Sequence, residues 1–439
     1  MFHKELIEYM ENSVIPLLSE HFICIRCIGR LLAGLGTGLD NRIRGEAILT
    51  LLTMNIDYSL KSETEKVEIQ SYKKIAENTL YKPLLETLKK YGHELTVEEN
   101  KKCVFCGSNL DRLIDHFVKE SLERLKEVSA NTFLVAIKHS EKIIAREEEI
   151  VRRYKLKYYE LMERELKREV GKKISELTGL QPDFQKPDVI ILLDLDAETV
   201  NIKPMNLYIL GRYFKVGRNI SQIKWMYKND HYHRRISFSI EEALIPLIKM
   251  FKGSKVKLHA AGREDVDVRM LGTGRPVVIE VKEALNRNIN LEDVERVLNA
   301  QHPYIKFKLI EYSDKKTLRK LKIESPMKSK IYRALIYSPS KLSAEEVRSI
   351  EEYFRNVTVV QRTPKRVRHR RADIVRRKIV HEVKMRIVDH NLVESIIYCQ
   401  GGLYVKELIS GDGGDTSPSF SEILGKDLEC IELDVLLVS

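Results

Sequence analysis

The sequence predicts an α+β fold, with a mainly helical first part followed by a C-terminal part built on a mixed or antiparallel sheet. Apolar residues recur at intervals of three and four in residues 6–18 and 44–52, which is the spacing of one helix face. From about residue 237, short β-rich runs dominate, and helical patterns such as residues 343–354 separate some of them. A chain of 439 residues is long enough for two or three domains, each with its own core.

Residues 1–120 are expected to form a helical or ribbon region that binds a metal ion. Four of the six cysteines fall into two Cys-x-x-Cys pairs, Cys24 with Cys27 and Cys103 with Cys106. One such turn can direct two thiolates at one ion, and two turns supply the four tetrahedral ligands of a structural zinc site. Two unrelated turns, or a redox pair, are the alternatives. Because a doubled pair rarely arises by chance, we expect structural Zn²⁺ at a closed site.

The middle of the chain changes from helical to strand-like patterns. Residues 140–178 are rich in Glu, Lys and Arg, which predicts one or two long helices that end at Gly179. Residues 189–195 (VIILLDL) indicate a strand buried on both faces, and residues 206–214 a second strand. The strands expected in the C-terminal part are residues 256–260, 277–281, 331–337, 357–361 and 379–387.

The positive charge is concentrated in one segment. The net charge is +11, and residues 361–378 hold nine Lys and Arg against one Asp. Clustered cations gain free energy by releasing the counterions of a polyanion, so we expect this segment to bind nucleic acid. Its expected contacts to the polyanion are Arg366, Arg368 and Arg370. A solvated basic face is the alternative.

No segment predicts a membrane or secreted protein. The apolar runs are too short to cross a bilayer, and the charged N-terminus does not have the pattern of a secretory signal. We therefore expect a cytoplasmic protein with no membrane partner.

Residues 258–272 (LHAAGREDVDVRMLG) resemble the signature of the archaeal and eukaryotic pseudouridine synthase family that modifies positions 54 and 55 of tRNA. Within this stretch, Gly-Arg-Glu-Asp at residues 262–265 is similar to the Gly-Arg-x-Asp catalytic loop of the wider superfamily. The resemblance implies that Asp265 is the catalytic carboxylate, with Asp267 as the competing assignment. Without the family, this stretch would be an ordinary charged turn before a strand.

The chemistry of the implied reaction suits a carboxylate at this place. Isomerising uridine means breaking the N1–C1′ bond, turning the base and rejoining it through C5. The arginines that flank Asp265 in the sequence, Arg263 and Arg269, would lower its pKa and keep it ionised. It would then attack the ribose or base, or remove the sugar proton, and the sequence leaves these roles open.

A second segment with a family resemblance lies in an expected strand. Residues 330–334 (KIYRA) resemble the family's Lys-x-Tyr-x-Ala strand. The resemblance implies that Tyr332 stacks on the target base, which needs an aromatic surface once it is extruded. An ordinary half-buried strand tyrosine is the alternative reading.

A third segment supplies a basic residue. Residues 401–414 (GGLYVKELISGDGG) resemble the family's Gly-x-Tyr-Ile-Lys-Glu segment. The resemblance implies that Lys406, or alternatively Arg263, orients the catalytic aspartate and that Leu408 is an apolar wall of the pocket. The family typically has Arg after Gly-Asp-x-Gly, whereas this chain has Asp415, so one contact to RNA is expected to be missing.

Residues 186–189 and 208–225 resemble the THUMP region of the same archaeal enzymes. THUMP domains generally bind the acceptor end of tRNA. The resemblance implies a THUMP-like tRNA-binding domain at residues 121–235 and a pseudouridine synthase domain at residues 236–439. The cations that it implies as phosphate contacts are Arg212, Lys215, Arg218 and Lys224.

The implied function is that of a tRNA pseudouridine synthase acting on uridine 54, uridine 55 or both. It needs no organic cofactor, because substrate and product are isomers, and no obligatory protein partner is inferred. The alternatives are another THUMP-containing tRNA enzyme and a catalytically silent tRNA-binding scaffold. A scaffold leaves unexplained the ordered set of Asp265, Tyr332 and Lys406.

Overall fold

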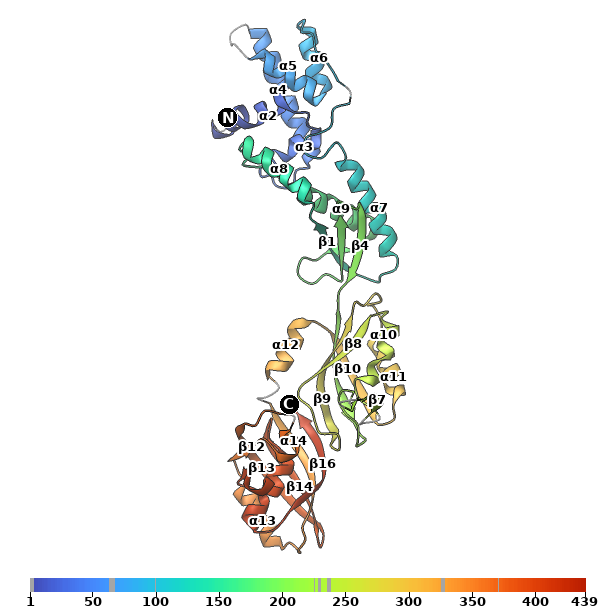
Figure 1. Ribbon diagram of the computed structural model, residues 1–439, viewed down its shortest axis with the longest axis vertical. Coiled ribbons are helices and arrows are strands. Elements are labelled where there is room, and N and C mark those ends of the chain that lie inside the picture. The colour runs from blue at the N-terminus through green and yellow to red at the C-terminus, as the bar shows by residue number, and fades with distance from the viewer. Residues whose placement is uncertain are drawn as a thin grey trace. The chain divides into compact units, whose positions relative to one another are not determined.

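In the computed structural model the chain divides into two compact units, Met1–Lys203 and Pro204–Ser439 (Figure 1). We call them unit 1 and unit 2. The structure describes residues 4–62, 68–98, 100–224, 226–227, 230–234, 238–324, 328–369 and 371–439. Each unit has its own cluster of buried hydrophobic residues, as a chain of this length predicts.

Unit 1 begins with a helical bundle. Its elements are α1 (Lys4–Tyr9), the π-helical η1 (Met10–Val14), α2 (Ile15–Glu20), α3 (Ile25–Arg30), α4 (Asn41–Ser62), α5 (Ile69–Thr79), α6 (Lys82–Lys90) and α7 (Leu110–Leu125). Helix α3 crosses α4 at very short range, and glycines make this possible. A Cβ on Gly45 would lie 1.9 Å from the carbonyl oxygen of Ile25, so only glycine fits there. This close crossing fixes the start of α3, where Cys24 and Cys27 lie.

The second part of unit 1 is an α/β layer. It contains β1 (Thr132–Lys138), α8 (Glu141–Arg153), α9 (Met162–Thr178), β2 (Gln181–Pro182), β3 (Val189–Asp194) and β4 (Thr199–Pro204). The sheet order is β2-β1-β3-β4, with β1 parallel to β2 and to β3. Helix α9 packs against β1. It ends at Gly179, whose φ of 75° and N–H bond to Ser175 form the expected C-cap.

The expectation that β3 is buried on both faces was wrong. Val189, Ile191 and Leu193 are fully buried, whereas Ile190 and Leu192 between them are partly exposed. The other face of this strand is therefore only partly covered. A short run of apolar residues does not indicate how completely each face of its strand is covered.

Unit 2 is organised around one large mixed sheet. The strands of unit 2 are β5 (Leu207–Lys215), β6 (Met226–Tyr227), β7 (Asp230–Arg234), β8 (Lys255–Ala260), β9 (Arg269–Lys282), β10 (Ile305–Ser313), β11 (Ser329–Tyr337), β12 (Val357–Arg362), β13 (Val375–Asp389), β14 (Leu392–Gln400), β15 (Thr416–Ser417) and β16 (Glu429–Val438). Of these, β6 and β7 pair with each other outside the large sheet. Its helices are η2 (Glu242–Leu244), α10 (Pro246–Met250), α11 (Leu291–Gln301), α12 (Lys315–Glu324), α13 (Ala344–Tyr353), α14 (Lys365–Arg368), α15 (Val405–Ser410), η4 (Gly411–Gly414) and α16 (Phe420–Leu424).

The sheet runs in the order β10-β5-β9-β16-β11-β14-β13-β12-β15, and β8 pairs with β9 outside this path. The neighbours whose registers are described are antiparallel, except that β9 and β16 are parallel where Arg269 lies opposite Asp434. This parallel junction joins the half of the sheet that contains β5 to the half that contains β11. The α+β fold class with a mixed or antiparallel sheet is confirmed.

The position of β5 differs from the expectation. Residues 208–225 were expected in a THUMP-like domain that ends at residue 235, but β5 pairs with β9 and β10 inside unit 2. The division of the chain comes after Lys203. Register within a sheet depends on partners far along the chain, so a strand pattern does not indicate which sheet the strand joins.

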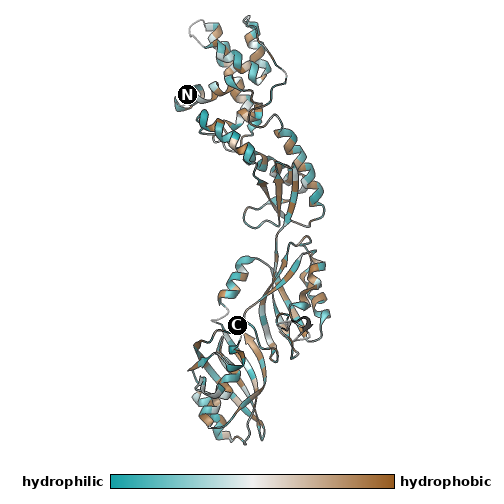
Figure 2. Cartoon of the chain, in the orientation of Figure 1, coloured by the Kyte–Doolittle hydropathy of each residue, from teal (hydrophilic) through white to brown (hydrophobic). Residues whose placement is uncertain are grey.

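Hydropathy follows this architecture. Figure 2 shows hydrophobic residues along the strands of both units, whereas the lysine-rich α12 is mostly hydrophilic. Among the described residues, no helix is long and apolar enough to cross a membrane.

Candidate active site

The loop that joins β8 to β9, residues 261–268, carries the two candidate carboxylates, Asp265 and Asp267. Gly262 adopts a φ of 80°, in the left-handed region that favours glycine, and this turn begins the loop. The loop borders a cavity of about 280 Å³ that is also lined by Arg263, Tyr332 and Lys406. The structure therefore brings together the residues that the sequence analysis named for catalysis.

A second cavity, of about 400 Å³, is lined by the same loop. It shares Asp265 and Lys406 with the first cavity and adds Asp267 and Gln222. Asp265 lines both cavities, but only the first contains Tyr332. Of the two carboxylates, Asp265 is therefore the one that shares a cavity with the aromatic ring.

The cation that contacts Asp265 is not the expected one. Arg366 donates from Nη1 to Asp265 Oδ2 at 2.6 Å and from Nε to Glu407 Oε1 at 2.6 Å. Burial lowers the pKa of the Arg366 guanidinium, but Glu407 and Asp265 outweigh burial, so the net shift is upward. Arg366 was predicted to bind nucleic acid. It instead holds the candidate catalytic carboxylate, 101 positions away in the chain.

Lys406 was expected to pair with Asp265 and instead pairs with Asp267, at 2.5 Å from Nζ to Oδ2. Burial raises the pKa of Asp267, but the hydrogen bond from Lys406 and its charge outweigh burial, so the net pKa is lowered. Asp267 is therefore ionised at neutral pH and already has a partner. Arg269, two residues after Asp267, was expected to flank Asp265. It instead pairs with Asp434, at 2.6 Å from Nη2 to Oδ2.

Tyr332 lies on β11, between Val435 of β16 and Ile397 of β14, with 9% of its surface exposed. Burial raises the pKa of its hydroxyl, so the ring is neutral. The apolar lining beside it includes Leu403 and Val405.

Leu408 was expected in the wall of the pocket. It is fully buried in the hydrophobic core of unit 2 and does not line the described cavity. Val405, three residues earlier on α15, lines the cavity instead. One short helix thus supplies both the cavity lining and the core.

Three of the four cations that were expected to contact phosphate bind main-chain carbonyl groups, and the fourth, Lys224, is exposed. Arg212 donates from Nη1 to Thr273 and Gly274 at 3.1 Å. Lys215 is 1% exposed, and Arg218 donates to Asp267 and Leu433. Lys215 has three carbonyl acceptors inside unit 2, whereas Arg212 and Arg218 are partly exposed, so phosphate contacts from these two stay a prediction.

The basic segment, residues 361–378, lies partly at the cavity. Arg371 and Arg376 line it, and their guanidinium carbons lie 5.9 and 5.4 Å from the ring centroid of Tyr404. Arg371 also donates to the Tyr404 hydroxyl at 3.0 Å. The sequence analysis did not single out these residues, although their place in the basic segment was a usable signal.

Asp415, which stands where the family typically has Arg, has a partner in the same segment. Arg368 donates to Asp415 Oδ2 at 2.7 Å and to the carbonyl of Thr363. Arg368 is therefore ion-paired within unit 2, and its contact with nucleic acid stays a prediction. Arg370, the third cation expected to bind nucleic acid, lies outside the described residues.

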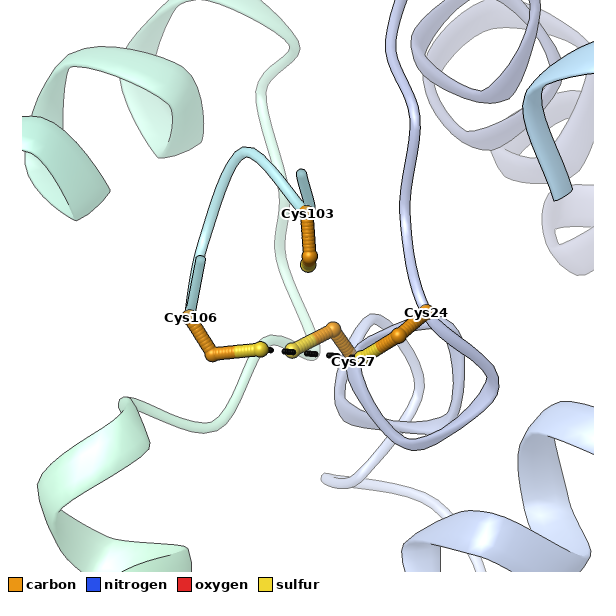
Figure 3. A group of neighbouring side chains, drawn as sticks. All are labelled: Cys24, Cys27, Cys103 and Cys106. Atoms are coloured by element: carbon orange, nitrogen blue, oxygen red, sulfur yellow. Dashed lines mark hydrogen bonds between the residues drawn. The ribbon is translucent and has the colours of Figure 1, made fainter. Parts of the chain in front are cut away.

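The four cysteines of the two pairs come together in unit 1. Their Sγ atoms all lie within 4.8 Å of one another, and Cys24 Sγ is 3.6 Å from Cys106 Sγ. Figure 3 shows the two pairs approaching from separate segments, with Cys24 and Cys27 at the start of α3. Zn–S bonds of about 2.3 Å in a tetrahedron place sulfur atoms roughly 3.8 Å apart, so the cluster fits a zinc ion.

Known proteins match both halves of the chain. The family descriptions "Pus10 THUMP domain, archaeal" and "Pus10, C-terminal" match residues 117–194 and 208–439. The tRNA pseudouridine synthase Pus10 of Ignisphaera aggregans is 38% identical over 422 residues, which is 96% of this chain and 97% of that protein. The chain belongs to the Pus10 family. The Pus10 protein of Methanocaldococcus jannaschii is 34% identical over 445 residues, 98% of this chain and 94% of its own.

The Pus10 family match also locates the THUMP region. The match to the archaeal THUMP description ends at residue 194. It therefore excludes β5, in agreement with the position of that strand in unit 2. Among solved structures, a Cbf5-Nop10-Gar1 complex matches 52% of this chain and 48% of its own, with 16% identity and a TM-score of 0.28. A pseudouridylate synthase matches 54% of this chain and 69% of its own, with 14% identity and a TM-score of 0.21.

Proposed function

We propose that this member of the Pus10 family converts uridine to pseudouridine at position 54, position 55 or both in tRNA, with Asp265 as the catalytic carboxylate. The observation that carries the assignment is the position of Asp265. It lines one cavity together with the buried ring of Tyr332, and Arg366 pairs with it. A carboxylate and an aromatic surface in one cavity are what a reaction on an extruded base requires.

The reaction breaks the N1–C1′ bond, joins C5 to C1′, adds a proton to N1 and releases the C5 proton. Arg366 donates to Asp265 and orients it, and the carboxylate acts as a nucleophile on the ribose or base, or as the base that removes a sugar proton. Tyr332 stacks on the uracil, and Leu403 and Val405 contribute apolar surface. No organic cofactor takes part, since the product is an isomer of the substrate.

The cations around the cavity divide between two roles in this proposal. Arg366 orients the carboxylate, and Arg371 and Arg376 contact the tRNA backbone at the cavity. Arg263 and Lys406 line both cavities, which suits contacts to the nucleotides on either side of the target base.

In unit 1 we propose a structural zinc ion held by the four clustered cysteines, and a THUMP domain that binds the acceptor end of tRNA. All four positions around the metal are then taken by thiolates, which is typical of structural and not catalytic zinc. We also propose that the protein is located in the cytoplasm, together with its tRNA substrate.

The test compares wild type with Asp265→Ala and Asp267→Ala on unmodified tRNA transcripts. Pseudouridine is mapped with carbodiimide, and tRNA affinity is measured in parallel. Transcripts that keep uridine only at position 54 or only at position 55 show which site is modified. We expect product from wild type, none from Asp265→Ala, and residual product from Asp267→Ala.

Two results contradict the proposal. Tight binding without any product from wild type supports the silent scaffold. Product from Asp265→Ala together with none from Asp267→Ala moves the catalytic role to Asp267.

A further inference from the structure

The main chain around Asp265 is held by side chains from β9 and from residues 215–222. Lys215 Nζ donates to the carbonyl oxygens of Asp265 and Val266 at 3.0 and 3.2 Å. The carbonyls on either side are bound as well, by Arg275 to Ala261 at 2.7 Å, Gln222 to Gly262 at 3.1 Å and Arg218 to Asp267 at 2.7 Å. We propose that Lys215, Arg218, Gln222 and Arg275, the loop cradle, position the catalytic loop and do not bind tRNA. This inference rests on the proposed function.

Lys215 has no donor left for a phosphate. Its ammonium group has three hydrogens, and it has three carbonyl acceptors, those of Ile220, Asp265 and Val266, at 2.9 to 3.2 Å. The side chain is 1% exposed, so it cannot reach a ligand without unfolding the loop. Burial lowers the pKa of Lys215, and the Glu264 carboxylate, 3.7 Å away, opposes that shift.

Arg218 ties the end of the loop to β16. Besides the carbonyl of Asp267, its guanidinium binds the Leu433 carbonyl and Asp434 Oδ1, each at 3.0 Å. Asp434 is 1% exposed and is also held by Arg269 at 2.6 Å. Arg218 therefore connects the loop to the parallel junction of the sheet, where Arg269 lies opposite Asp434.

Glu264 holds the loop through its own side chain. It is 2% exposed and accepts hydrogen bonds from Arg275 Nε and from the Tyr213 hydroxyl, each at 2.8 Å. Gln222 donates to that same hydroxyl at 3.1 Å as well as to the carbonyl of Gly262. The loop is thus held through its main chain and through the residue that precedes Asp265.

This arrangement has a kinetic consequence. A misplacement of about 1 Å in a reacting group costs roughly 10²-fold in rate. Loss of a cradle side chain should therefore lower the rate of the chemical step at saturating tRNA, without changing affinity. A cation that contacts phosphate behaves in the opposite way, because its loss weakens binding and reduces the salt dependence by about one unit of slope.

The experiment measures single-turnover rates at saturating tRNA, and tRNA dissociation constants over a series of KCl concentrations. The variants are Lys215→Met, Arg218→Met and Gln222→Leu, with Arg218→Lys as the conservative form. The matched comparison is Arg376→Met, which removes a cavity cation whose guanidinium faces an aromatic ring and not the loop. Thermal unfolding checks that each variant folds.

For the cradle variants we expect rates lowered by roughly 10²-fold for Lys215→Met and about 10-fold for Gln222→Leu, with dissociation constants within twofold of wild type. The salt slope should be unchanged, and Arg218→Lys should recover part of the lost rate. Arg376→Met should instead weaken binding and lower the slope. If Lys215→Met does not fold, the neutral change Gln222→Leu decides the question.

The cradle proposal is overturned if the Arg218 or Lys215 variants keep the wild-type rate at saturating tRNA but bind more weakly with a reduced slope. That result identifies them as phosphate contacts. An inactive wild type that binds tRNA overturns the proposed function itself, and the two failures are therefore distinguishable.

Discussion

Each of the two units buries an arginine, a glutamate and a tyrosine together, beside the cysteine cluster in unit 1 and beside the Asp265 loop in unit 2. In unit 1, Arg30 is fully buried and bonded to Glu147, and its Nη2 lies 2.5 Å from the Tyr159 hydroxyl. In unit 2, Arg275 is 1% exposed and pairs with Glu264, which also accepts from the Tyr213 hydroxyl. Each trio combines an arginine, a glutamate and a tyrosine.

The trios differ in what they face. Arg30 donates from Nη1 to Cys27 Sγ at 3.2 Å, so its guanidinium also contacts the cysteine cluster. Arg275 donates to the carbonyl of Ala261 and lines the cavity of Asp265. Burying an ion pair contributes little net stability, because desolvation offsets the attraction. The comparison therefore indicates that each trio serves to hold a neighbouring group in place, the cysteine cluster in unit 1 and the loop that carries Asp265 in unit 2.

Metal removal should produce the largest difference between the units. Structural zinc contributes on the order of 10 kcal/mol to the folding of small zinc domains. We expect a strong chelator to release about one zinc ion per chain and to unfold the region around α3, while amide exchange of the unit 2 sheet stays slow. Zinc released is measured by a colorimetric indicator and protection by hydrogen exchange. Equal loss of hydrogen-exchange protection in both units would contradict this difference between them.

The glutamates of the two trios offer a matched pair of substitutions. Glu147→Gln removes the nearer of two carboxylates that pair with Arg30, and Glu165 remains at 3.5 Å. Glu264→Gln leaves the buried Arg275 without the carboxylate that it pairs with, which typically costs about 3–5 kcal/mol. We expect the first to lower thermal stability and zinc affinity, with the chemical rate at saturating tRNA kept. The second should lower that rate by at least 10²-fold with zinc content unchanged. Swapped effects on zinc and rate would show that the trios do not have separate roles.

Lys330 sharpens the comparison because, unlike Arg30, it pairs with no carboxylate in the described part of the chain. It lines the Asp265 cavity, and burial, with repulsion from Arg275, lowers its pKa from 10.5 to about 8. Below pH 8 the folded protein therefore carries a buried charge. Between pH 8 and 10.5 the unfolded chain binds more protons, so the free energy of unfolding rises with pH.

From this shift we expect Lys330→Met to be more stable than wild type at pH 7, by up to about 3 kcal/mol, with the gain vanishing above pH 10.5. The affinity of wild type for tRNA should fall as pH rises through 8, and that of the variant should not. Urea unfolding and tRNA binding from pH 6.5 to 9 measure both quantities. A wild-type affinity that is flat across pH 8 contradicts the prediction.

Much of the fold could be predicted because it depends on local patterns. Helix α9 ends at Gly179, and α13, β8, β11 and β12 lie where periodicity placed them. The four cysteines were found from their spacing, and Asp265 and Tyr332 from a resemblance, and the structure places the latter two in one cavity. Spacing and periodicity are properties of neighbouring residues, and the sequence contains them directly.

The partners of the charged side chains could not be predicted in the same way. Arg366 contacts Asp265, 101 positions away in the chain, and Lys406 contacts Asp267, 139 positions away. Both contacts depend on how the strands of the sheet align. Lys215 and Arg218 belong to a cation-rich stretch that a sequence cannot distinguish from a phosphate-binding face.

The sequence by itself determined many of the elements, the four cysteines that cluster and the candidate acid. Only the tertiary structure decided which cation binds a carboxylate, which binds a main-chain carbonyl and which lines the cavity. The physical reason is that the strength of a charge interaction depends on distance and burial, and both exist only in the folded chain.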